Sequence, residues 1–192
     1  MGDETTKPSR SPRADSLRNR ERLIEAATEV FSGGRGQASL EAVARSAGVG
    51  IGTLYRHFPT REALFDAVYR REVDQLCELA EELAQDGEPV EALRRWLHAN
   101  VRLVAAKKGM IAALQLAASS ELKAYSFDRL TEALDLLLRR GVAAGKIRGD
   151  VTADDLLRTI VGIFYSDGPS DWQASALRLV DVFVDGLRTP EG

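Results

Sequence analysis

The sequence has few of the side chains that build catalytic or metal sites. Its 192 residues include one cysteine, Cys77, and two histidines, His57 and His98, far apart in the chain. A single cysteine cannot form an internal disulfide, and none of these residues has the spacing of metal ligands. There is also no G-x-G-x-x-G, P-loop or G-x-S-x-G motif. These absences predict a protein that is not an enzyme and that holds no metal or cofactor.

Long apolar runs are missing as well. No run reaches the roughly 18 residues of a membrane span, and the polar first residues predict no secretory signal. No segment shows the alternation of a β-strand, whereas the 44% hydrophobic share is enough for a packed core. We therefore expect an all-α protein in the reducing cytoplasm. There Cys77 packs as a small hydrophobe; a redox role is the alternative.

The net charge of −3 is unevenly distributed. Residues 1–61 carry ten basic and seven acidic side chains, a balance of +3, and the remaining residues carry a balance of −6. A basic front and an acidic rear predict that the N-terminal part contacts phosphate. Residues 1–15, rich in Ser, Thr, Pro and charge, are expected to form a disordered basic arm. Its arginines either solubilise the chain or reach into a minor groove.

The stretch from Leu40 to Phe58 has the pattern of a helix-turn-helix. Apolar residues at helical spacing precede Gly48, which suits a sharp turn, and Leu54 and Phe58 continue an apolar face after it. The opposite face of the second helix is polar and aromatic, and such a short helix fits the major groove of DNA. Two short helices joined through a glycine also occur in ordinary helical bundles, so this pattern alone leaves both interpretations open.

The longer string from Ala47 to Phe65, AGVGIGTLYRHFPTREALF, resembles the TetR family of bacterial transcription regulators. It contains a small-residue turn, a T-L-Y core, an aromatic end to the recognition helix, and then a proline and a basic residue. Gly50 stands where Ser or Thr is common, which predicts a recognition helix without a side-chain cap. Arg61 stands where the family usually has lysine. The resemblance covers about residues 20–65.

The resemblance and the polar face together predict which residues meet DNA. Thr53 and Tyr55 are expected to reach the groove and the backbone, and His57 a phosphate, with a solvated helix end as the alternative for His57. Arg45 and Arg61 are expected to hold phosphates on either side. The full set of candidate DNA-binding residues is Arg45, Gly50, Gly52, Thr53, Tyr55, Arg56, His57 and Arg61.

The pattern of the rest of the chain predicts helices that are separated by glycine and proline residues. A helix-turn-helix domain is expected over residues 16–62, and a helical ligand-binding and dimerisation domain over residues 63–192, with the fourth helix connecting the two. Gly109 is expected to end the fifth helix, with Lys107 and Lys108 at its C-terminal dipole. About nine helices are predicted, including helices over 17–31, 61–84, 89–106 and 110–118 and two opened by capping boxes at 152–155 and 170–173.

A ligand site is expected where polar side chains interrupt apolar helices of the second domain. A few polar groups among apolar and aromatic ones are typical of small-molecule sites, although plain core is the alternative for each residue. Asn100 and Gln115 are the informative members, because a buried amide needs a hydrogen-bond partner. The candidate ligand-binding residues are Trp96, Asn100, Met110, Leu114, Gln115, Tyr125 and Phe164.

The last two helices have wide apolar stripes that suit a dimer interface. Two such hairpins about a two-fold axis would form a four-helix bundle, as the resemblance also implies; the alternative is that the last helix folds back on its own domain. The candidate interface residues are Ile160, Phe164, Trp172, Leu179, Phe183 and Leu187. The resemblance implies a homodimeric repressor that a small molecule releases from a palindromic operator. An activator, a ligand-independent regulator and a helical interaction module are the alternatives.

Overall fold

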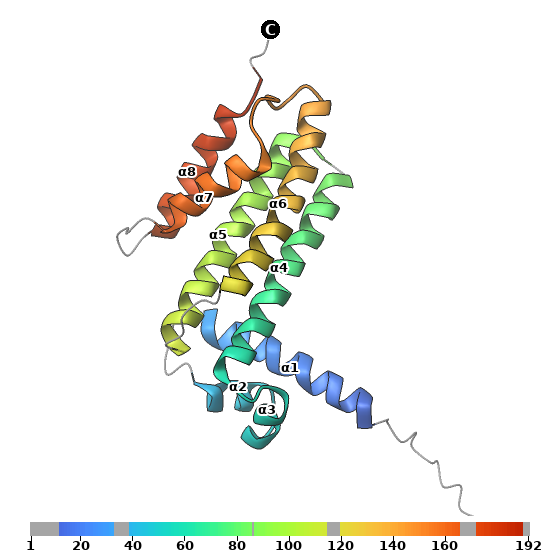
Figure 1. Cartoon of the computed structure of the whole chain (residues 1–192), viewed down its shortest axis with the longest axis vertical. Coiled ribbons are helices and arrows are strands. Elements are labelled where there is room, and N and C mark those ends of the chain that lie inside the picture. Colours follow the sequence, from blue (N-terminus) through green and yellow to red (C-terminus); the bar gives the residue numbers. More distant parts are fainter. Residues whose placement is uncertain (1–11, 33–38, 86, 115–119, 166–171, 190–192) are drawn as a thin grey trace, which may run out of the picture. The chain divides into compact units, whose positions relative to one another are not determined.

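The computed structural model describes residues 12–32, 39–85, 87–114, 120–165 and 172–189 (Figure 1). These residues form α-helices and one isolated bridge, which confirms the predicted all-α class. The helices are α1 (Pro12–Ser32), α2 (Leu40–Ser46), α3 (Ile51–His57), α4 (Arg61–Gln85), α5 (Pro89–Leu114), α6 (Ser120–Ala143), α7 (Ala153–Tyr165) and α8 (Trp172–Gly186).

Contacts divide the chain into two compact units, residues 1–68 and 69–192. The division falls within α4, beyond the boundary that the sequence predicts after residue 62. In unit 1, the apolar faces of α1, α2 and α3 contact one another, and Leu23, Val43 and Leu54 are fully buried. The first helix begins at Pro12 rather than at Leu17, because proline is well accommodated at the first position of a helix. Residues 1–11 of the expected arm lie outside the described residues.

A single helix, α5, takes the place of the two helices that the sequence predicts over residues 89–106 and 110–118. It continues through Gly109 to Leu114, and residues 115–118 lie outside the described residues. A glycine inside a helix costs only about 1 kcal/mol relative to alanine. Burial of Val101 and Met110 on either side outweighs that cost. The prediction that Gly109 ends a helix is therefore wrong, and the described helices number eight rather than about nine.

Unit 2 is built around α5. This helix packs against α6 and α8, and α6 packs against α7; Figure 1 shows α7 and α8 side by side. Arg94 and His98 on α5 both contact Asp181 on α8, at 2.9 and 2.8 Å. The hydrogen bond from Arg94 is the main reason that the pKa of Asp181 lies below its ordinary value. The inner face of α8 is therefore tied to α5.

A turn and a helix cap in unit 2 have the structure that their local sequence predicts. Gly145 ends α6 with a φ of 66°, a conformation that favours glycine. Thr152 and Asp155 form the predicted capping box of α7: each side chain accepts the other residue's backbone N–H at 3.2 Å. The second predicted box, at 170–173, begins outside the described residues.

Candidate functional site

The turn between α2 and α3 has the geometry that the sequence predicts. The Ser39 side chain caps α2 by accepting the Ala42 N–H at 3.2 Å. Gly48 turns the chain with a φ of 65°, and the Val49 N–H donates to the Ala44 carbonyl at 2.9 Å. Gly50 precedes α3 without a side-chain cap, as predicted. The first backbone N–H groups of α3 are thus left without a capping side chain.

Burial separates the two faces of α3. Leu54 and Phe58 are buried in unit 1, and Arg20 of α1 stacks over the Phe58 ring at 5.2 Å. The opposite face is open: Tyr55 is 46% exposed although it is aromatic. Thr53 and His57 are half-buried, and Gly50, Gly52 and Arg56 are exposed. A Cβ at Gly52 would meet no atom within 4 Å, so the backbone there is directly accessible.

Two exposed arginines lie near the same carboxylate of unit 1. The pKa of Glu41 is lowered first by a hydrogen bond from its own backbone, then by Ser39, and then by the positive charges of Arg61 and Arg45. These charges act on one group because the C-terminal turn of α2 and the first turn of α4 both lie near it. Arg45, Arg61 and the exposed face of α3 together make an accessible basic surface, which we call the α3 surface.

Unit 2 contains a cavity of about 410 Å³. It lies among α4, α5, α6 and α7, within the range of small-molecule sites. Its wall is mostly apolar, and its polar members come from three helices. The lining residues are Tyr69, Asn100, Leu103, Val104, Lys107, Ile111, Lys123, Ser126, Phe127, Leu130, Leu157 and Val161.

Of the residues that the sequence predicts for a ligand site, Asn100 lies in the wall of this cavity. Trp96 is fully buried in the core, where its Nε1 donates to the Leu76 carbonyl at 2.8 Å. Met110 is buried but does not line the cavity, and Tyr125 donates instead to Asp74 at 2.9 Å. The side chains of Leu114 and Phe164, and the whole of Gln115, lie outside the described part of the chain.

Most of the cavity wall, above all Tyr69, Lys107 and Phe127, is not among the ligand-site residues predicted from the sequence. The sequence predicts a helix that ends at residue 106, which would place Lys107 at the exposed helix terminus. In the structure α5 continues past Lys107, and the side chain is buried beside the cavity. The spacing of these residues could have indicated that Lys107 belongs to the site, because Lys107 lies two helical turns after Asn100 on the same side of the helix.

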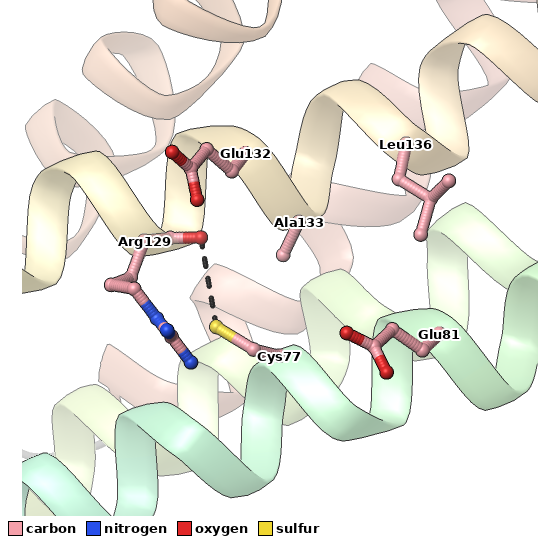
Figure 2. Close-up of a pocket in the computed structure, with 6 residues that line it drawn as sticks. All are labelled: Cys77, Glu81, Arg129, Glu132, Ala133 and Leu136. Atoms are coloured by element: carbon pink, nitrogen blue, oxygen red, sulfur yellow. Dashed lines mark hydrogen bonds between the residues drawn. The ribbon is translucent and has the colours of Figure 1, made fainter.

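A second, smaller pocket of about 160 Å³ contains the cysteine (Figure 2). The Cys77 Sγ lies 3.6 Å from the Arg129 carbonyl oxygen, to which it donates, and the residue is only 8% exposed. Burial raises the pKa of the thiol, so it stays protonated near neutral pH. This environment is that of a packed cysteine rather than a reactive one.

The candidate interface residues of α7, α8 and the position after α8 differ in burial. Ile160 and Leu187 are buried within their own chain, and Trp172 and Phe183 are half-buried. Leu179 is 49% exposed. Val182, which is not among the residues predicted from the sequence, is 70% exposed on the same helix. The Phe164 side chain lies outside the described residues. Leu179 and Val182, three residues apart, form an apolar stripe on the outer side of α8.

None of the described helices is long and apolar enough to cross a membrane.

Comparison with known proteins gives two family-model matches. The model described as "Bacterial regulatory proteins, tetR family" matches residues 23–68, and the model described as "Transcriptional regulator SbtR-like, C-terminal domain" matches residues 88–189. Among curated proteins, the HTH-type transcriptional regulator UidR of Escherichia coli is 36% identical over 75 residues. That match covers 38% of this chain and 35% of UidR, so the chain spans about a third of such curated relatives.

Solved structures match over much more of the chain. The TetR transcriptional regulator SCO0520 from Streptomyces coelicolor is 40% identical, with a TM-score of 0.72, over 90% of this chain and 99% of that one. A TetR transcription regulatory protein from Mycobacterium vanbaalenii is 32% identical, with a TM-score of 0.70, over 93% and 100% of the two chains.

Proposed function

The chain belongs to the TetR family of bacterial regulatory proteins, and we propose that it is a cytoplasmic, homodimeric repressor that a small molecule releases from a palindromic operator. Family membership identifies a transcription regulator and not an enzyme. The observation that carries the proposal is the α3 surface: an open helix face with an exposed aromatic side chain, flanked by exposed arginines. A buried core on the other side of α3 holds this face in place.

In the proposed complex, α3 enters the major groove. Tyr55 and Thr53 reach base edges and the backbone, Arg56 extends the contact along the groove, and His57 touches a phosphate. Arg45 and Arg61 neutralise phosphates on either side. The bare backbone at Gly50 and Gly52 permits close approach of the nucleic acid, because no side chain keeps it away.

A dimer follows from the need for two recognition helices, because one helix reads too few base pairs to specify a site in a genome. The outer faces of α7 and α8 supply the interface in this proposal. Leu179 and Val182 are the apolar side chains of α8 that their own chain leaves most exposed. The α7 and α8 helices of two protomers would pack together as a four-helix bundle around a two-fold axis.

Release by a ligand requires that the ligand favour a state in which the two α3 helices no longer match the two half-sites. The cavity of unit 2 is the proposed ligand site. Helix α4 is the proposed coupler: residues 61–68 belong to unit 1, and residues 69–85 of the same helix belong to unit 2. Tyr69, the first residue of unit 2, lines the cavity.

The salt dependence of operator binding tests the phosphate contacts. Each phosphate-neutralising side chain contributes about −0.9 to the slope of log K against log salt concentration. Arg45→Ala and Arg61→Ala should therefore each flatten the slope by about one unit per contacted half-site. Arg95→Ala, which removes an exposed arginine of unit 2, is the matched control and should leave the slope as in the wild type. Equal slopes for all four proteins would show that these arginines do not contact phosphate.

A further inference from the structure

Three polar side chains of the unit 2 cavity, Lys107, Tyr69 and Ser126, are connected by hydrogen bonds. Lys107 Nζ donates to the Tyr69 hydroxyl at 3.3 Å and lies 4.5 Å from the centre of its ring. Tyr69 is hydrogen-bonded in turn to Ser126, and the Ser126 hydroxyl donates to the Lys123 carbonyl at 3.0 Å. Tyr69 thus accepts from Lys107 and contacts Ser126, whose own proton goes to the Lys123 carbonyl. This chain of contacts begins at a cation and ends at a backbone carbonyl.

The cation at the head of that chain has no counter-ion among the described residues. Lys107 is 5% exposed, and its described partners are the hydroxyl and ring of Tyr69. Burial raises the pKa of Tyr69, so the phenol stays neutral and does not balance the ammonium. No acidic side chain is among the described residues that line the cavity. A buried charge without a partner is costly, so its presence calls for an explanation.

A second polar group in the wall also lacks a partner. Asn100 is 2% exposed, and its Nδ2 makes no hydrogen bond in the described structure. An ammonium has three donors, of which one is used here, and an amide nitrogen has two. The unused hydrogen-bonding capacity of Lys107 and of the Asn100 nitrogen therefore consists entirely of donors. Such a wall complements a group that accepts hydrogen bonds and carries negative charge.

The remainder of the cavity wall is apolar. Leu103, Val104, Ile111, Leu130 and Leu157 supply aliphatic side chains, and Phe127 adds an aromatic ring. They come from α5, α6 and α7, and the volume of about 410 Å³ lies toward the lower end of the range for small-molecule sites. An apolar body of modest size is thus the natural complement of this part of the wall.

We propose that the effector of this cavity is a small amphipathic carboxylate, whose anionic head pairs with Lys107 and Asn100 and whose apolar tail lies along the aliphatic wall. This inference rests on the proposed ligand site in unit 2, and it specifies the class of molecule. It is independent of whether binding releases DNA.

Calorimetric titration of the full chain without DNA tests the class. The probes are decanoate, decanol and decyltrimethylammonium, which share a tail length and differ in the head group. Wild-type protein should bind decanoate most tightly. Lys107→Met should weaken decanoate binding roughly ten- to hundredfold, as expected for loss of a charge-assisted hydrogen bond, and should leave decanol binding unchanged. Lys146→Met, the same change at an exposed lysine outside the cavity, should bind decanoate as the wild type does.

The wild-type comparison decides the question even if Lys107→Met fails to fold. Decanol or decyltrimethylammonium binding as tightly as decanoate would overturn the proposal, and so would a folded Lys107→Met protein that binds decanoate normally. Thermal melting of the ligand-free variant supplies a further readout, because removing an uncompensated buried charge should not lower the melting temperature. Decanoate that binds through Lys107 and leaves a DNA complex intact would support the ligand class and contradict the proposed release mechanism.

Discussion

Val182→Asp and Leu179→Asp are each expected to convert the protein to monomers. Both side chains are largely exposed in the single chain, so aspartate at either position should leave the fold of the monomer intact. In the proposed dimer, the same position would bury an unpaired carboxylate in an apolar interface, twice by symmetry, at a cost of several kcal/mol. Sedimentation should show monomers. Operator affinity should fall by roughly 10²- to 10⁴-fold, because the second half-site is no longer held by a tethered recognition helix.

Leu136→Asp is the matched control for this experiment. Leu136 is 41% exposed on α6, where it lines the small pocket with residues of α4 and α6, and aspartate there should leave the dimer intact. Phe183→Asp is a weaker test than the sequence suggests, because Phe183 is half-buried within its own chain and its replacement would also disturb the monomer. Dimers of normal operator affinity in both Val182→Asp and Leu179→Asp would place the interface elsewhere.

Tyr55→Ala is expected to weaken operator binding by roughly 1–3 kcal/mol, provided that the ring contacts a base. The side chain is 46% exposed on α3 and is rotated about 100° around the helix from the buried Leu54. Its removal should therefore leave the melting temperature of the protein close to that of the wild type. Fluorescence anisotropy with an operator fragment measures the loss.

Tyr55→Phe separates the two ways in which this residue can act. If the ring makes an apolar contact, the phenylalanine variant should bind as the wild type does, whereas loss of a hydrogen bond from the hydroxyl should reproduce most of the alanine effect. Unchanged operator affinity in Tyr55→Ala would remove Tyr55 from the interface and with it the assigned reading face of α3.

Local patterns in the sequence predict unit 1 well because its structure is decided by local chemistry. The cap at Ser39, the positive φ at Gly48 and the uncapped start of α3 after Gly50 each depend on a few neighbouring residues. The burial of Leu54 likewise follows from helical spacing alone. These features place the α3 surface without knowledge of any distant contact.

The ligand cavity was harder to predict because it depends on contacts between distant segments. Gly109 has the sequence signature of a helix end, yet packing along α5 overrides that local preference. Because α5 continues for about two more turns, to Leu114, Lys107 lies within the helix and lines the cavity instead of standing at a helix terminus. Tyr69 and Phe127 join it there from α4 and α6, and no local pattern indicates that these segments meet. Asn100 was predictable because a polar residue on an apolar stripe is visible in the sequence.

Selection of DNA from a genomic fragment library of the source organism, at moderate salt, tests the central claim most directly. The wild-type protein should retard particular fragments in a gel and protect two inverted half-sites in a footprint. The Tyr55→Ala protein should show a preference weakened by roughly 1–3 kcal/mol and should keep its salt-dependent binding to random DNA. Retention of every fragment no better than random DNA would contradict the assignment of the protein as a sequence-specific regulator acting through α3.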